Sequence, residues 1–380
     1  MAEGDEYLTV AEVARLLRVH RTTVWRWITS GRLHGYRLGT RTLRVRRDDL
    51  RRFLHSAAVS IRPPYPPRPP VALRLAPSPG SVLAVTGGRG AGVYPPGFEY
   101  AVPTTVAEAL DLLSQRGDEA KVLAGGQSLI PLMKLRLASP AWLIDINRIS
   151  ELDYVREDGE GLRVGALARH RTLERSTLVA RRYPTIAAAA PQIADPLVRN
   201  LGTLAGSLCH ADPQGDWGAV AVAMDARLVA RSRRGERVIA ASEFFRGPLA
   251  TALQADELVT EVIFPPPPDH VFGTYLKLER KVGDFATVGV AVVLHLDGGR
   301  VARAGIGLTA VGPTYLRARR AEALLAGRPL DNALAVEAGR EAAAEAEPTS
   351  DHRGSADYKR QVVRVFVTRA LRQALAARAA

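Results

Sequence analysis

The pattern of apolar and polar positions divides the chain into two structured regions separated by a proline-rich stretch. Between residues 9 and 55, apolar residues recur twice at helical spacing, then alternate as in β-strands, and then return to helical spacing. From residue 98 onward, short apolar runs of strand length alternate with amphipathic helical segments. We therefore predict an N-terminal module over residues 7–56, a linker over 61–97 and a larger body over 98–377.

The N-terminal module begins with a helix-start signal, because Thr9 and Glu12 have the spacing of a capping box. A second helix is expected from Arg21 to Ile28, β structure from Leu33 to Val45, and a third helix from Asp48 to near His55. This order, and the stretch LTVAEVARLLRVHRTTVWRWITSGRL in particular, resembles the excisionase-type, MerR-like winged helix-turn-helix family. The resemblance implies DNA binding.

The charge distribution agrees with a nucleic-acid partner. Residues 1–62 hold 13 Arg and no Lys against six acidic residues, a net charge of +7, whereas the other 318 residues carry +6. An Arg-rich composition throughout the genome would explain this excess too, and a solvated Arg face on a small bundle is the alternative to DNA binding. The side chains expected to contact DNA are Arg21, Thr22, Thr23 and Arg26 on the second helix and Arg41 and Arg44 on the wing.

The linker over residues 61–97 contains ten of the 25 prolines, and no Asp or Glu occurs from Leu50 to Phe98. The stretch IRPPYPPRPP favours polyproline II, and GGRGAG favours a flexible chain. Because no apolar period survives here, we predict that the linker is disordered.

The first candidate for chemistry is KVLAGGQSLIPLMKLRL, residues 121–137. A short apolar strand, Val122–Ala124, is followed by Gly125 and Gly126 and then by a helix-compatible run. Glycines allow a tight turn and the close approach of a phosphate, and the first N–H groups of a helix have no internal partner. The stretch matches neither GxGxxG nor the P-loop pattern, so a plain turn is the alternative.

A second small-residue turn lies in NLGTLAGSLCHADPQGD, residues 200–216, and is followed by the carboxylates of Asp212 and Asp216. Two such turns with nearby carboxylates suit a ligand that carries both phosphates and a sugar or ribityl chain. AGGQSL, followed some eighty residues later by TLAGSLCHADPQGD, resembles the FAD-binding medium subunits of molybdenum hydroxylases, the family of aerobic carbon monoxide dehydrogenase and xanthine dehydrogenase. The resemblance covers roughly residues 94–375, and further stretches occur in family order, namely YPPGFEY, LIDINRI, GALAR and KLERKVGDFATVGVAV.

The resemblance implies an α+β fold. Its FAD-binding domain, of the PCMH or molybdopterin dehydrogenase type, would cover residues 98–270, with a small α/β unit over 98–150 and a larger α+β unit over 151–270. A C-terminal domain over 271–377 would place a sheet before three helices near 317–325, 331–346 and 355–377. FAD would lie in the cleft between the two units of the FAD-binding domain.

The residues that the resemblance assigns to FAD are Ala124, Gly125, Gly126, Gln127, Ser128 and Leu129 in the first turn, Thr203, Leu204, Ala205, Gly206 and Ser207 in the second, and Asp212 and Asp216. The turns would hold the diphosphate, and Asp216 would accept hydrogen bonds from ribityl or ribose hydroxyls. Ala205 departs from the glycine usual in this family, and its methyl group could tighten the approach of the diphosphate. Replacing Gly125 with Asp is expected to abolish FAD retention.

No catalytic residue and no metal site are predicted in this chain. The eight His are scattered, and the single Cys209 cannot hold an iron–sulfur cluster, which normally takes four thiolates. The resemblance implies that the flavin carries the chemistry. A large molybdopterin subunit would oxidise the substrate, a small [2Fe-2S] subunit would relay the electrons, and this oxidoreductase subunit would pass them to an external acceptor.

The remaining expectations concern location and the role of the N-terminal module. No apolar run reaches the roughly 18 to 20 residues of a membrane span, and MAEGDEYLT lacks the layout of a signal peptide, so we expect a soluble, cytoplasmic protein. The family's chains commonly begin near the position of Val93–Pro96, so the module is either a working fusion or an artefact of gene assignment. The alternative function is a flavin-responsive, DNA-binding transcriptional regulator.

Overall fold

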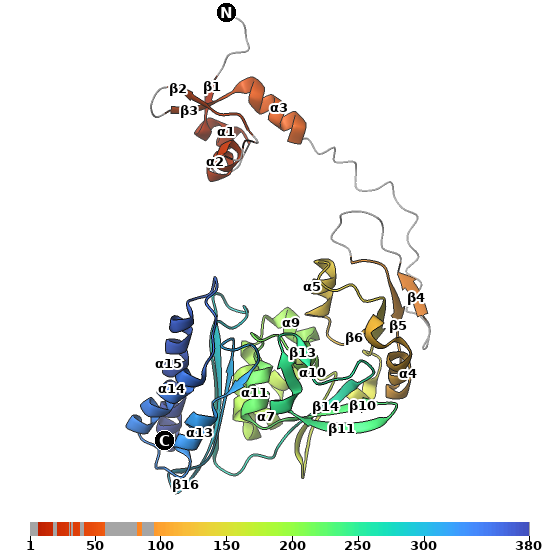
Figure 1. Cartoon of the computed structure of the whole chain (residues 1–380), viewed down its shortest axis with the longest axis vertical. Helices are drawn as coiled ribbons and strands as arrows, with labels where there is room; N and C mark the ends of the chain where they lie inside the picture. The colour runs from red at the N-terminus through yellow and green to blue at the C-terminus, as the bar shows by residue number, and fades with distance from the viewer. Residues whose placement is uncertain are drawn as a thin grey trace, which may run out of the picture. The chain divides into compact units, whose positions relative to one another are not determined.

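The computed structural model describes residues 7–17, 21–29, 31, 33–38, 42–57, 82–85 and 95–379 (Figure 1). The chain forms two compact units, Met1–Ala76 and Pro77–Ala380, and each is described by itself. In the described part of the chain, no helix combines the length and the apolar character that a transmembrane span requires.

The first unit has the predicted winged helix-turn-helix order. Thr9 and Glu12 form the predicted capping box, and a three-stranded antiparallel sheet in the order β1-β3-β2 packs with the helices around Val13, Val24 and Val45. Trp27 packs against Phe53. The elements are β1 (Tyr7–Thr9), α1 (Val10–Leu16), α2 (Arg21–Thr29), β2 (Tyr36–Leu38), β3 (Thr42–Arg46) and α3 (Arg47–Ala57).

The prediction of disorder over residues 61–97 is wrong for Val82–Val85, which form strand β4. This strand pairs antiparallel with β5 in the second unit. A four-residue run is too short to show an apolar period of its own, so only its partner strand could reveal it. Most of the remaining linker lies outside the described residues.

The small α/β part of the second unit has a four-stranded sheet in the order β4-β5-β7-β6. Strands β5, β7 and β6 are parallel, and the first glycine turn follows β6 directly. The predicted helix after Thr105 is present, with the Thr105 side chain accepting from the Glu108 N–H. The elements are β5 (Phe98–Ala101), α4 (Val106–Arg116), η1 (Gly117–Glu119), β6 (Ala120–Leu123), α5 (Leu129–Lys134) and β7 (Trp142–Asp145).

The larger part is built on a five-stranded antiparallel sheet in the order β11-β10-β14-β9-β8. Helices α8, α10 and α11 enclose an apolar core with this sheet, and Trp217, Tyr183 and Tyr275 are its largest buried side chains. The strands are β8 (Val155–Asp158), β9 (Gly161–Gly165), β10 (Arg227–Ser232), β11 (Gly235–Ala240) and β14 (Leu258–Phe264), with a separate pair β12 (Phe245–Gly247) and β13 (Ala250–Thr251). The helices are η2 (Ser150–Leu152), α6 (His170–Arg175), α7 (Thr177–Arg182), α8 (Pro184–Ala189), η3 (Ala190–Gln192), α9 (Pro196–Leu201), α10 (Leu204–His210), α11 (Trp217–Ala223) and α12 (Ala241–Phe244).

The C-terminal part is the predicted sheet followed by three helices. Alternate residues of β16 serve two cores: Val290 and Val292 belong to the cluster with the C-terminal helices, and Ala291 belongs to the cluster with α11. Side chains at Gly305 or Gly307 would collide with backbone oxygens of α11, so these glycines allow α11 to lie directly on β17. The elements are β15 (Val271–Leu278), β16 (Val288–Asp297), β17 (Arg300–Thr309), β18 (Leu316–Arg317), α13 (Arg319–Leu325), α14 (Asn332–Glu345) and α15 (Ala356–Ala379).

Candidate cofactor site

The first glycine turn connects the end of β6 to the start of α5. Gly126 has a φ of +70°, a conformation that L side chains rarely adopt, and its carbonyl accepts the Ile130 N–H. The Gln127 side chain donates to the Gly125 carbonyl at 3.1 Å. All predicted residues from Ala124 to Leu129 are partly exposed, so a ligand can reach them.

The second turn lies directly against the first. A Cβ atom on Gly125 would collide with the carbonyl oxygen of Leu201 and would lie 2.6 Å from Gly202 Cα. A Cβ atom on Gly206 would lie 4.0 Å from the Cβ of Ala124. The two turns, which are far apart in the sequence, therefore meet in one site, and glycine is what lets them approach so closely.

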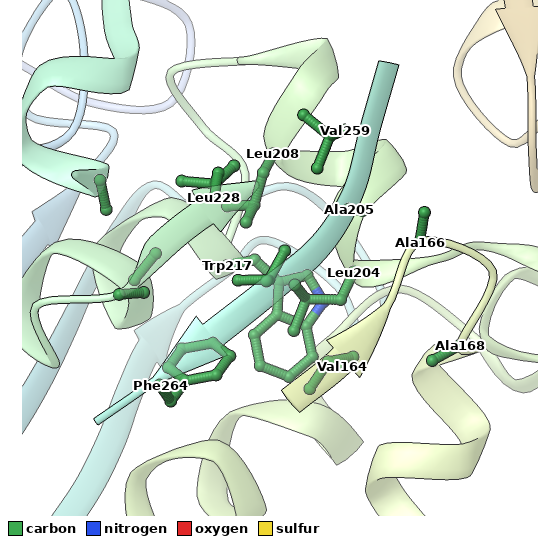
Figure 2. Packing of buried hydrophobic residues seen from close by; sticks show 14 of the residues in the cluster. Val164, Ala166, Ala168, Leu204, Ala205, Leu208, Trp217, Leu228, Val259 and Phe264 are labelled. Carbon is green, nitrogen blue, oxygen red and sulfur yellow. The ribbon is translucent and has the colours of Figure 1, made fainter. Parts of the chain in front are cut away.

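The predicted residues of the second turn divide into two groups. Thr203 is buried and caps α10 by accepting the Gly206 N–H at 3.0 Å. Leu204 and Ala205 belong to the hydrophobic core with Trp217 and are almost fully buried (Figure 2). Gly206 and Ser207 remain partly exposed. The expected conflict between the Ala205 methyl group and a diphosphate does not arise, because that methyl group is part of the core.

Four side chains that sequence reasoning did not assign hold the two turns together. Asn147 Nδ2 donates to the Ala124 carbonyl at 2.7 Å and to Asp145 Oδ1 at 2.6 Å. Arg169 donates from Nη2 to Asn147 Oδ1 at 2.7 Å and from Nη1 to the Leu201 carbonyl. Tyr100 donates its hydroxyl to Asp145 Oδ2 at 2.5 Å. We call Tyr100, Asp145, Asn147 and Arg169 the loop clamp.

Three of the four loop-clamp residues lie in stretches that the family resemblance already includes, although the sequence alone assigned no role to them. Asp145 and Asn147 lie in LIDINRI and Arg169 ends GALAR, two of the stretches on which the family resemblance rests. Burial lowers the pKa of Arg169, whereas Asp153 and Asp145 oppose this effect. A guanidinium remains charged under these conditions, so the clamp contributes a permanent cation beside the two turns.

The two predicted carboxylates, Asp212 and Asp216, differ in burial and in hydrogen-bond partners. Both oxygens of the buried Asp216 already accept hydrogen bonds, Oδ1 from Tyr275 at 2.6 Å and Oδ2 from Lys277 at 3.1 Å. Burial raises the pKa of Asp216, and the neighbouring Lys277 counteracts that rise. Asp212 is partly exposed, and its Oδ1 accepts the Gln214 N–H within a turn. These bonds do not favour Asp216 as an acceptor for ribityl hydroxyls, and that role stays a prediction.

His170 contacts the second turn at Gly202 through both its backbone and its imidazole. Its backbone N–H donates to the Gly202 carbonyl at 2.9 Å, and a Cβ on Gly202 would lie 2.8 Å from His170 Nε2. Trp217 Nε1 donates to His170 Nδ1 at 3.0 Å, which requires an unprotonated Nδ1. Burial, with smaller contributions from Arg199 and Arg169, lowers the pKa of His170 to about 4. The imidazole is therefore neutral near pH 7 and acts as an acceptor.

Comparison with known proteins is consistent with this site. Residues 96–267 match the FAD binding domain in molybdopterin dehydrogenase, and residues 273–374 match the CO dehydrogenase flavoprotein C-terminal domain. The carbon monoxide dehydrogenase medium chain of Hydrogenophaga pseudoflava is 43% identical over 284 residues, which cover 75% of this chain and 99% of that one. The chain belongs to the family of FAD-binding medium subunits of molybdenum hydroxylases.

Other members of the medium-subunit family have similar sequences or structures. The glyceraldehyde dehydrogenase medium chain of Sulfolobus acidocaldarius is 36% identical over 74% of this chain and 99% of that one. The structure of carbon monoxide dehydrogenase from Hydrogenophaga pseudoflava that lacks the Mo-pyranopterin moiety matches with a TM-score of 0.72 and 45% identity, over 74% of this chain and 98% of its own. We call the two turns, which meet where Gly125 lies against Leu201 and Gly202, the glycine cradle; its small residues fit the FAD that this family binds.

The segment KLERKVGDFA, residues 277–286, packs against the residues just before α9 in this medium subunit. Lys277 is engaged by Asp216, and Asp284 pairs with Arg353 at 3.1 Å, which lowers the pKa of Asp284. A Cβ on Gly283 would lie 3.1 Å from the Ala194 backbone, next to the N-cap of α9. The segment therefore lies next to the residues that precede α9, the helix that ends at the second turn.

Within the described residues, no group of three or more His, Cys, Asp or Glu side chains could hold a metal ion. Burial raises the pKa of the Cys209 thiol to about 12, so the thiolate, which is the reactive and metal-binding form, is strongly disfavoured. Burial also lowers the pKa of His210.

Residues 7–58 of this chain match a helix-turn-helix domain. Thr23 on α2 and Arg44 on β3 are partly exposed, and Arg44 donates to the Leu43 carbonyl at 3.4 Å. Arg21, Thr22 and Arg26 belong to α2, but their side chains lie outside the described ones, and Arg41 lies outside the described residues altogether. Their contact with DNA stays a prediction.

Proposed function

We infer that this chain is the FAD-carrying subunit of a molybdenum hydroxylase complex, and that it takes electrons from a partner [2Fe-2S] subunit and passes them to an external acceptor. The observation that carries this proposal is the close approach of the two glycine turns, in which Gly125 lies against Leu201 and Gly202. Such a cradle has no room for side chains but leaves backbone groups accessible to a diphosphate.

The residues proposed to hold FAD are those of the two turns that remain accessible. Ala124 to Leu129 would surround the diphosphate from one side, with Gly206 and Ser207 on the other. Thr203, Leu204 and Ala205 would act indirectly, by fixing α10 in the core. When bound, FAD would supply the redox chemistry, while the protein binds and orients it.

Substrate choice is assigned to a partner subunit. Relatives of comparable similarity are named for different substrates: carbon monoxide, glyceraldehyde and, among solved structures, quinoline. The single cysteine of this chain excludes a cysteine-ligated cluster held by this chain alone. A subunit shared by enzymes with such different substrates is best explained as a common electron-transfer module.

The experiment is purification of the full chain, alone and after co-expression with a molybdopterin subunit and a [2Fe-2S] subunit of this family. The proposal expects a yellow protein with one FAD per chain, and a complex that contains molybdenum and iron and reduces this flavin when substrate is added. A folded, colourless chain that does not take up added FAD would overturn FAD binding. A flavoprotein that never associates with molybdenum or iron would overturn the electron-transfer role.

The second candidate function is a flavin-responsive DNA-binding regulator. The helix-turn-helix match over residues 7–58 favours it, because an electron-transfer subunit has no need of such a module. This candidate expects a lone flavoprotein that binds an operator fragment and releases it when the flavin is reduced. If the chain binds the operator fragment equally well in both redox states, or does not bind it, this second candidate function is excluded. The first candidate function is not affected by that result.

A further inference from the structure

Strand β4 adds a feature to the flavoprotein that the family match does not include. The match to the FAD binding domain begins at residue 96, whereas β4 covers Val82–Val85. In the sheet order β4-β5-β7-β6, this strand covers what would otherwise be the open edge of β5. An open edge strand presents unpaired backbone groups that invite pairing with another segment.

The backbone geometry identifies which groups β4 satisfies. Glu99 donates its N–H to the Ala141 carbonyl on the β7 side at 2.8 Å. Since successive backbone groups of a strand point to opposite edges, the N–H groups of Phe98 and Tyr100 point toward β4. Leu83 lies opposite Tyr100, and Val85 lies opposite Phe98. These two pairs are therefore the ones that exchange backbone hydrogen bonds.

Tyr100 connects this edge to the loop clamp. Its backbone pairs with Leu83, while its hydroxyl donates to Asp145 Oδ2. Asp145 Oδ1 in turn accepts from Asn147, which holds the Ala124 carbonyl of the first turn. Hydrogen bonds on both ends of Tyr100, its backbone and its hydroxyl, thus link the docked strand to the first turn.

We propose that residues 82–85 are a docking strand that closes the β5 edge and, through Tyr100 and the loop clamp, stabilises the glycine turns in their FAD-binding arrangement. The coupling part rests on the proposed FAD function, whereas the docking part does not. If docking of β4 raises the affinity for FAD by a given factor, thermodynamic linkage requires that bound FAD raise the docking equilibrium of β4 by the same factor.

The test compares two single proline variants of the full chain. Leu83→Pro removes an N–H that points to Tyr100, whereas Ala84→Pro removes one that points to the free edge, where proline is tolerated. Hydrogen exchange of Phe98–Ala101 reports docking, and fluorescence titration reports FAD affinity. Leu83→Pro is expected to speed exchange over Phe98–Ala101 and to weaken FAD about fivefold or more, with Ala84→Pro close to wild type.

A different result would overturn each part of the proposal, namely the docked strand, its coupling to FAD and the route through Asp145. Unchanged exchange over Phe98–Ala101 in Leu83→Pro, or equal exchange in the two proline variants, overturns the docked strand. Faster exchange with unchanged FAD affinity overturns the coupling. A third variant, Tyr100→Phe, keeps the backbone pairing and removes the hydroxyl; it should weaken FAD without speeding exchange of the β5 amides, and wild-type affinity overturns the route through Asp145. A wild-type chain that binds no FAD defeats the proposed function, while the exchange comparison still decides docking.

Discussion

At the level of single residues, Gly125 determines how closely the two turns approach. Any side chain at this position would collide with the Leu201 carbonyl. A Gly125→Asp variant would therefore separate the turns even if no carboxylate ever met a diphosphate. Loss of FAD by that variant is still expected, but it could not identify the diphosphate site, so a substitution that leaves the turns in contact is needed.

Ser128 offers such a substitution. It occupies the N-cap of α5, and its side chain makes no capping hydrogen bond. A carboxylate near a helix N-terminus interacts favourably with the helix dipole, so Ser128→Asp should leave the apo protein at least as stable as wild type. The new carboxylate should nevertheless weaken FAD about tenfold or more by repelling the diphosphate, which corresponds to about 1.4 kcal/mol per factor of ten. Flavin fluorescence titration measures the affinity, and thermal unfolding measures the stability.

The control for this charge effect is Ser128→Asn, which has nearly the shape of the Asp variant and no charge. It should bind FAD with an affinity near that of wild type. Equal affinities for the Asp and Asn variants would mean that no phosphate lies near Ser128, and the assignment of the first turn would fail.

His170 should make the stability of the flavoprotein depend on pH. Its pKa is about 4 in the folded protein and near 6.5 in an unfolded chain, so the unfolded state binds more protons between these values. Stability from this group is complete above pH 6.5 and falls as the pH drops toward 4, by about 3 kcal/mol in all. His170→Gln keeps an acceptor for Trp217 but does not titrate.

Urea unfolding of both proteins between pH 4 and 7, followed by tryptophan fluorescence, isolates this contribution. Carboxylates titrate in both proteins, so the difference between wild type and His170→Gln should shrink or reverse as the pH falls. Parallel stability curves across the whole range would show that His170 does not keep a depressed pKa.

At the level of elements, the sequence predicted the turns but not what holds them. A strand, two glycines and a helix start are neighbours in the chain, so a local pattern reveals them. The loop clamp joins residues that are 45 positions apart, as for Tyr100 and Asp145, or 22 apart, as for Asn147 and Arg169. No local pattern shows such partners. The same limit applies to Leu204 and Ala205, because small apolar residues in a turn suit a ligand and a core equally well.

The loop clamp should behave as one unit in mutagenesis. Asn147→Asp keeps the size and still accepts from Arg169, but it loses the donor to the Ala124 carbonyl and places an oxygen there instead. Arg169→Lys cannot donate to Asn147 and Leu201 through one planar fork. Each variant should weaken FAD about tenfold, and the double variant should weaken it by less than the product, since residues in one network are not additive.

Flavin titration of the four proteins gives the coupling directly, and circular dichroism shows whether the fold is retained. Effects on FAD affinity that multiply would show that Asn147 and Arg169 act independently. In that case the clamp would be two separate contacts rather than a device that holds the turns at a common distance.

At the level of the whole molecule, the net positive charge is distributed unevenly between the N-terminal module and the flavoprotein. The first 62 residues hold more than half of the net charge of +13, in a module with its own small core. Both units pair some of their arginines within the fold, as in Arg163 with Glu261 and Arg199 with Glu174 in the flavoprotein and Arg52 with Asp49 in the module. Net charge alone would predict diffuse attraction to DNA, whereas the division predicts attraction through the module.

Paired alanine substitutions separate these two origins of DNA affinity. Arg21→Ala with Arg26→Ala removes two charges from α2, and Arg319→Ala with Arg372→Ala removes two from exposed positions on α13 and α15, so both variants have the same net charge. If α2 contacts the phosphates, the first variant should bind a duplex more weakly and show a salt slope smaller by about 2, and the second should match wild type. Fluorescence anisotropy at several salt concentrations measures both quantities. Equal losses in the two variants would mean that the chain attracts DNA through its overall charge, and the winged module would then have no special part in binding.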